Sequence, residues 1–348
     1  MSQPAVQPHG AKRVEFEAKR LAMVVVVAAV TMWPPLVVGR ILLGPMALTM
    51  LLFGSLVGFI NTAAGGRRLG ALTALIFTLA MPVALVAGQD DLAGTCLMAL
   101  ACLGIGTSSY WKRFAGFHVG LVGILFIITS PAAMVAKMDG GPEQTRYFLA
   151  VLVGTAVCAF WPVVFAPMLH LVKDVPMDAH FERPDTVRYL VMMTIVVSAA
   201  TLYALVYARD THGVWLPLTL LMVLQVAPSD TKRRALQRVW GTIAGAVFAA
   251  VVATAFHGTW VVLAVGIVVF LGMLSMAGRE PYGLFAFFLT AVVLLGVSAT
   301  EPAAEASAQR IMYTVLGAAI ALAVYFLTLA MARRAADRAP ATAPAASG

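Results

Sequence analysis

The arginines are the side chains of this 348-residue chain with the clearest chemical potential, because several adjoin long apolar runs. Arg68 and Arg238 each stand twenty residues before a glycine, Gly88 and Gly258. A planar guanidinium group can hold a carboxylate through two parallel hydrogen bonds. Arg68 and Arg238 are therefore candidate ligands for an organic anion. The alternative is that they only anchor the inner ends of membrane helices.

Two threonines stand near prolines inside apolar runs, where a helix is expected to be interrupted. Thr49 follows Pro45, and Thr219 follows Pro217 and Trp215. A proline frees a backbone carbonyl, and interrupted helices that line a cavity are one route to a binding site within a membrane. Thr49, Thr219 and Trp215 are thus candidate substrate or pore residues, with a simple packing kink as the alternative.

Other polar or small residues in apolar runs have more ordinary explanations. Gln225 is a substrate candidate, although a hydrogen bond between helices explains it equally. His118 is a candidate for proton coupling, because the pKa of histidine lies near neutrality. Gly241 and Gly245 form a small-xxx-small pair, which predicts close packing of two helices.

Sequence features of an enzyme are absent. The chain has no phosphate-binding loop, no metal-ligand spacing and no grouping of serine, histidine and carboxylate that suggests a nucleophile. Its three cysteines, Cys96, Cys102 and Cys158, lie in apolar runs and are expected to be small core residues. We therefore expect no catalytic activity, no metal and no cofactor.

Composition indicates the elements that must position these residues. Hydrophobic residues make up 61% of the chain and charged residues 11%, whereas soluble domains carry about 25% charged residues. The net charge of +8 is spread between apolar runs, which favours membrane topology over a nucleic-acid partner. The sequence predicts an all-α integral membrane protein in contact with lipid.

Spanning the hydrocarbon layer takes about 20 apolar residues per helix. Apolar runs between charged or Gly/Pro breaks predict about twelve transmembrane helices, at 21–38, 42–60, 69–88, 92–110, 114–136, 147–170, 189–208, 213–228, 239–257, 259–276, 281–299 and 311–331.

Basic residues support this count. With both termini in the cytoplasm, nineteen of the 24 Lys and Arg residues fall inside, as the positive-inside rule requires. Lys232, Arg233 and Arg234 belong to this inner set. Five fall outside: Arg40, Lys137, Arg146, Arg209 and Arg310. Arg40 is a further substrate candidate, because a charge beside an apolar run needs a partner such as Asp90 or Asp210, or an aqueous cavity.

The two halves are alike at an offset near 168 residues, which predicts two parallel six-helix repeats with a substrate path between them. The expected organisation is a cytoplasmic N-terminal segment, a first repeat, a cytoplasmic linker, a second repeat and a disordered cytoplasmic tail, at 1–19, 20–170, 171–187, 188–332 and 333–348.

One segment carries a family resemblance. Trp215-Leu-Pro-Leu-Thr219, then Gln225, then the basic run from Lys232 to Arg238 with Gly241-Thr242-Ile-Ala-Gly245 resembles the fusaric acid resistance protein-like family of integral membrane transporter domains, in the aromatic acid exporter group. The resemblance implies export of small, often aromatic, carboxylic acids across the bacterial inner membrane, driven by the proton gradient. Many members carry large cytoplasmic domains, for which this chain has no room between its predicted helices.

Two other functions stay open at this stage. A passive organic-anion channel agrees with the absence of carboxylates in the middle of the predicted spans. A major facilitator transporter also has twelve helices, but Ala63 and Ala64 replace the charged residues expected in its first inner loop. Expected partners are membrane lipids and a small organic anion, together with a periplasmic adaptor protein or further copies of the chain.

Overall fold

The computed structural model describes residues 22–23, 26–27, 29–41, 48–109, 114–129, 142–169, 183–209, 211–224, 228–257, 259–276, 281–297 and 303–338, and this part of the chain contains helices and turns but no strand. Besides helical residues within 22–41, its helices are α2 (Leu48–Ala87), α3 (Asp91–Ser109), α4 (Phe114–Thr129), α6 (Pro142–Val164), α7 (Ala166–Leu169), α8 (Arg183–Tyr207), α9 (Trp215–Val223), α10 (Pro228–Ala255), α11 (Trp260–Met276), α12 (Tyr282–Val297) and α13 (Ala303–Arg338).

Local sequence explains where several helices begin. Pro142 opens α6 and Pro228 opens α10, at a position where the missing N–H of proline costs nothing. The side chain of Asp90 caps α3, since its Oδ1 accepts the backbone N–H of Ala93 at 2.7 Å. The expected all-α fold is confirmed for the described residues.

Helix α2 consists of two helices joined at a kink. Gly66 has φ 72° and ψ −171°, a combination that is essentially restricted to glycine. The kink falls in the interval 61–68, between two predicted apolar ranges. Each of the twelve predicted ranges overlaps helical residues in the described part of the chain.

Helix bounds differ from the predicted ranges where polar residues continue a helix. Helix α10 begins at Pro228 rather than 239, because the Lys, Arg, Ala, Leu and Gln residues at 232–238 are good helix formers. In the same way α8 begins at Arg183, within the predicted linker, and α13 continues to Arg338, within the predicted disordered tail. The other expected domain boundaries stay predictions.

Within the described residues, four helices are long and apolar enough to cross a membrane, namely Gly65–Ala87, Val187–Tyr207, Asp230–Ala255 and Ala304–Met331. Several shorter apolar helices accompany them. Large apolar side chains are exposed along these helices, for example Leu79, Ile195 and Val251, as expected for surfaces that face lipid. The protein is therefore a multi-pass α-helical membrane protein, and the number of twelve spans stays a prediction.

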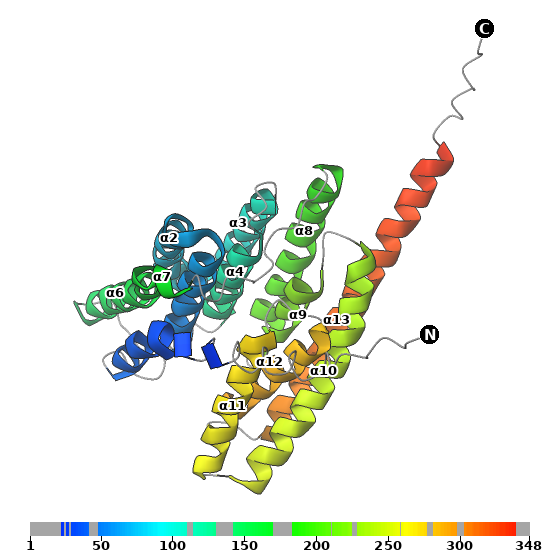
Figure 1. Ribbon diagram of the computed structural model, residues 1–348. Coiled ribbons are helices and arrows are strands. Elements are labelled where there is room, and N and C mark those ends of the chain that lie inside the picture. Colours follow the sequence, from blue (N-terminus) through cyan, green and yellow to red (C-terminus); the bar gives the residue numbers. More distant parts are fainter. Residues whose placement is uncertain are drawn as a thin grey trace, which may run out of the picture.

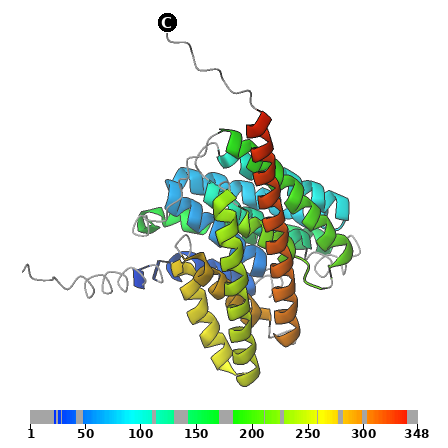
Figure 2. The same cartoon turned by 90° about the vertical axis from the view of Figure 1, so that its right-hand side faces the viewer.

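The helices form two groups (Figure 1). Helix α2 packs against α6 and α4 in the first group, and α10 packs against α12 and α13 in the second. Helix α3 packs along α8 and so joins the groups, while α9 lies between α8 and α13. Figure 2 shows α10 and α13 running side by side.

The two groups repeat one packing scheme. Gly58 of α2 closely approaches Ala159 of α6, and Thr219 of α9 closely approaches Gly317 of α13. Gly123 of α4 packs on Phe77 of α2, as α12 packs on α10. We count the six predicted membrane spans within each half of the chain. In both halves the second predicted span then packs on the sixth, and the third packs on the fifth. This correspondence is what the predicted six-helix repeat would produce.

Candidate anion-binding site

Two arginines are completely buried in the second group of helices. The side chains of Arg238 on α10 and Arg310 on α13 are both 0% exposed. Each lies within a helix that can cross the membrane, about 15 Å from the start of α10 and about 10 Å from the start of α13. Buried charged side chains within membrane helices are rare and usually have a function.

Arg310 lies over an aromatic ring. Its Cζ atom is 4.0 Å from the centre of the Trp215 ring, a distance at which the ring face attracts the cation. Its Nε, Nη1 and Nη2 atoms have no hydrogen-bond partner among the described residues. The ring therefore covers the face of the guanidinium and leaves the N–H groups around its edge unused.

Arg238 is held in a different way. Its Nη1 donates a long hydrogen bond of 3.4 Å to the hydroxyl of Tyr282, while its Nε and Nη2 have no partner in the described part of the chain. The half-buried Arg234 lies with its Cζ 5.3 Å from the centre of the Tyr282 ring. Arg310 lies on α13, which packs along α10, and Arg238 and Tyr282 act on it electrostatically. We call Arg234, Arg238, Arg310 and Tyr282 the basic cluster.

No carboxylate of the described residues neutralises Arg238 or Arg310. The ion pairs seen in this part of the chain join Arg209 to Asp91 at 2.9 Å and Arg233 to Asp230 at 3.8 Å. Leaving a buried charge without a counter-ion is strongly destabilising. The cluster is therefore electrostatically complementary to an anion.

Trp215 is fixed by its own neighbours. Its ring meets Phe126 of α4 edge-on, with 5.7 Å between ring centres, and stacks with His212 at an angle of 9°. Its carbonyl accepts the hydroxyl of Thr219 at 2.8 Å. Thr219 is buried and in turn packs on Gly317 of α13. These contacts keep the ring in place beneath Arg310.

Hydrogen bonds join the turn before α9 to α13. His212 has φ 55°, and its Nδ1 lies 3.0 Å from the Oε1 of Gln309. The hydroxyls of Thr211 and Tyr313 lie 2.8 Å apart. Gln309 is the residue before Arg310, so these bonds hold Arg310 in register with Trp215.

Of the sequence candidates, Trp215 contacts Arg310, Thr219 bonds to the Trp215 carbonyl, and Arg238 is buried on α10. Arg40 is exposed, and Arg68 is exposed just after the kink at Gly66. The proposed equivalence of Arg68 and Arg238 therefore does not extend to their surroundings. The side chains of the remaining candidates, Thr49, His118 and Gln225, lie outside the described residues.

Arg310 is the principal residue that the sequence reasoning missed. It was assigned to an outer loop, but α13 begins seven residues earlier, at Ala303, and buries it. The available signal was in the repeat, since Arg146 precedes Val-Leu-Val-Gly154 in the first half much as Arg310 precedes Val-Leu-Gly317 in the second.

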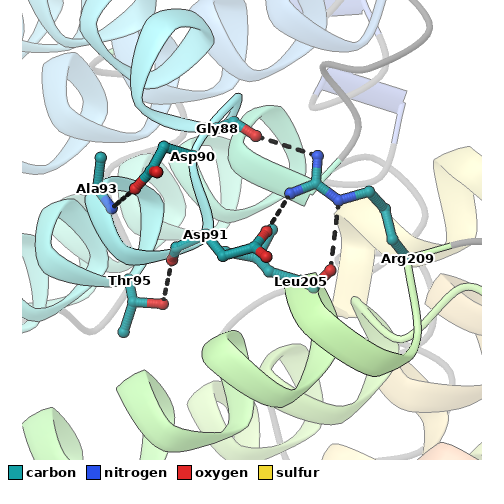
Figure 3. A network of polar contacts seen from close by, with 7 residues as sticks. All are labelled: Gly88, Asp90, Asp91, Ala93, Thr95, Leu205 and Arg209. Atoms are coloured by element: carbon teal, nitrogen blue, oxygen red, sulfur yellow. Dashed lines mark hydrogen bonds and ion pairs between the residues drawn. The ribbon is translucent and has the colours of Figure 1, made fainter.

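Arg209, which follows α8, is the centre of a polar network at one end of this helix (Figure 3). Its Nη2 contacts Asp91, its Nη1 donates to the carbonyl of Gly88 at 3.1 Å, and its Nε donates to the carbonyl of Leu205 at 3.4 Å. Arg209 thereby ties the end of α8 to the start of α3.

Gly241 and Gly245 lie where α10 approaches α12. An added Cβ would lie 2.3 Å from the carbonyl oxygen of Gly283 at Gly241, and 2.5 Å from that of Phe287 at Gly245. The close approach requires residues without a side chain. It also places the start of α12, with Tyr282, beside Arg238.

The features described so far are those of a multi-pass helical membrane protein with a buried basic cluster. Residues 187–324 match the family described as fusaric acid resistance protein-like, a family of membrane transporters. The matched region contains Trp215, Arg238 and Arg310, so the family resemblance is confirmed for this part of the chain. No curated protein and no solved structure matches the chain significantly.

Proposed function

We propose that this protein exports small organic acids, aromatic ones among them, across the bacterial inner membrane. The observation that carries the proposal is the pair of buried arginines, Arg238 and Arg310, which form no ion pair with a described residue. A carboxylate entering the cluster would meet unused N–H donors in a site of low dielectric constant, where charge-assisted hydrogen bonds are strong. The match to a transporter family over 187–324 supports the same assignment.

Aromatic surroundings favour acids with a ring. Trp215 and Phe126 belong to the main hydrophobic cluster of the protein, and Tyr282 contacts Arg238. A ring attached to the carboxylate would pack on these side chains by offset or edge-on contacts. We therefore choose benzoate as the first probe.

Proton coupling is part of the proposal and distinguishes an exporter from a channel. A passive channel is favoured by one observation, namely that neither arginine pairs with a carboxylate that could also carry a proton. The test is uptake of labelled benzoate into inside-out vesicles, with and without an imposed proton gradient. Accumulation that an uncoupler abolishes would establish export, whereas equilibration that ignores the gradient would establish a channel.

Variants of α10 test whether the benzoate flux depends on the buried arginine. Arg238→Gln removes the charge and should reduce affinity by roughly 2 kcal/mol or more, about 30-fold. The matched control is Arg233→Gln on the same helix, because the Arg233 side chain is 54% exposed and exposed pairs contribute little. Equal flux in both variants would contradict the assignment of the site.

A further inference from the structure

We propose that the anion held at this site carries two negative charges, one beside Arg238 and one beside Arg310, and that the preferred substrates are small dicarboxylates. The inference rests on the proposed function, because it assumes that the basic cluster is the substrate site. To the proposed function it adds two properties of the substrate, namely its net charge and its number of carboxylates.

The first argument is the geometry of the unused donors. In a guanidinium group Nε and Nη2 point in the same direction and form one edge that matches a carboxylate. The Nη1 of Arg238 is used by Tyr282, and Nε and Nη2 have no partner. Arg238 therefore offers one complete edge for one carboxylate.

Arg310 offers a second, separate edge. Its three nitrogens have no hydrogen-bond partner, and the Trp215 ring lies over its face rather than at its edge. A carboxylate can approach in the plane of this guanidinium without displacing the ring. One carboxylate that pairs with two parallel bonds to one arginine leaves the donors of the other arginine unused.

The second argument is charge balance. Both side chains are 0% exposed and lie in membrane-crossing helices, so water and salt screen their charges little. A monoanion neutralises one guanidinium and leaves the other as a buried, unpaired charge, whereas a dianion neutralises both. Arg234 is only half-buried, so the solvent can screen its charge.

The test compares two acids with the same ring and different charge. Full-length protein in lipid nanodiscs is titrated with benzoate and with phthalate near pH 7.5, where both carboxyl groups of phthalate are ionised. We expect phthalate to bind at least about tenfold more tightly. Succinate and butyrate form a second pair without a ring, and should show the same order.

Variants of Arg310 test whether its positive charge causes the tighter binding of phthalate. Arg310→Gln should weaken the binding of both acids, and that of phthalate at least about tenfold more than that of benzoate. Arg310→Lys keeps the charge and should retain the preference. Arg334→Gln, on the exposed end of the same helix, is the control and should change neither affinity.

The outcomes distinguish a failure of the dianion inference from a failure of the proposed function. Benzoate binding as tightly as phthalate to the wild type would overturn the dianion inference and leave the transport of organic acids standing. Arg310→Gln losing both acids equally, while remaining monodisperse, would also overturn it. Failure of all four acids to bind the wild type would overturn the proposed function as well. If Arg310→Gln does not fold, the wild-type comparison of the two acid pairs decides alone.

Discussion

The guanidinium of Arg310 lies over the ring of Trp215, with its Cζ 4.0 Å from the ring centre. This contact joins α13 to α9, and it places a positive charge in the interior of the second helix group. The ring replaces part of the hydration that a buried cation loses. It does not replace the hydrogen bonds, since the three guanidinium nitrogens have no partner. The contact thus leaves the guanidinium without a counter-ion among the described residues, as the proposed anion site requires.

Removing the ring should weaken both the fold and the site. Trp215→Leu deletes the cation–π contact, worth about 1–2 kcal/mol in a desolvated site, and leaves space in the core. We expect a total loss of roughly 3 kcal/mol or more and weaker anion binding, measured by thermal unfolding and by titration. Trp240→Leu is the control, because Trp240 is 70% exposed. Equal losses for the two variants would contradict a specific role for the ring.

The close approach of α10 and α12 gives a second prediction. Gly241→Ala puts a Cβ 2.3 Å from the carbonyl oxygen of Gly283, so the helices must separate, at a cost of about 1–3 kcal/mol. Gly266→Ala on α11 meets no atom within 4 Å and should be neutral or slightly stabilising. Thermal unfolding of the purified variants distinguishes the two positions. A neutral Gly241→Ala would show that the helices are not in close contact.

The kink in α2 gives a third prediction. Gly66 has φ 72° and ψ −171°, and an added Cβ would meet nothing within 4 Å. The cost of Gly66→Ala therefore comes from the backbone alone, about 1–3 kcal/mol. Gly104→Ala on α3, which also meets no atom, is the control. Equal unfolding temperatures for the two variants would argue against the kink.

The contact between the helix groups gives a fourth prediction. Arg209 and Asp91 are separated by 118 positions and lie 2.9 Å apart. Because Asp91 is 45% exposed, the pair should contribute only about 1 kcal/mol. A double-mutant cycle with Arg209→Gln and Asp91→Asn should measure that coupling. A coupling energy of zero would show that the two side chains do not interact in the membrane.

The elements of this fold could be predicted from the sequence to a large extent. Twelve apolar ranges overlap helices, since apolar runs and their polar breaks are local features. The break at Gly66 was also local, because Gly65 and Gly66 precede Arg67 and Arg68.

The composition of the site was less predictable. Glu305, Gln309 and Arg310 interrupt the apolar run before position 311, so the sequence predicts a loop where the helix in fact continues. Its contact with Trp215 bridges 95 positions, which no periodicity can show. Trp215 and Arg238 were found because they belong to the motif that carries the family resemblance.

The most direct test of the account is labelled phthalate and benzoate flux into proteoliposomes containing the wild type, Arg238→Gln/Arg310→Gln or Arg233→Gln. The account predicts saturable flux in the wild type and in Arg233→Gln, and loss of at least about 30-fold in the double variant. Undiminished flux in a folded double variant would contradict it, because the buried arginines would then have no part in moving the anion.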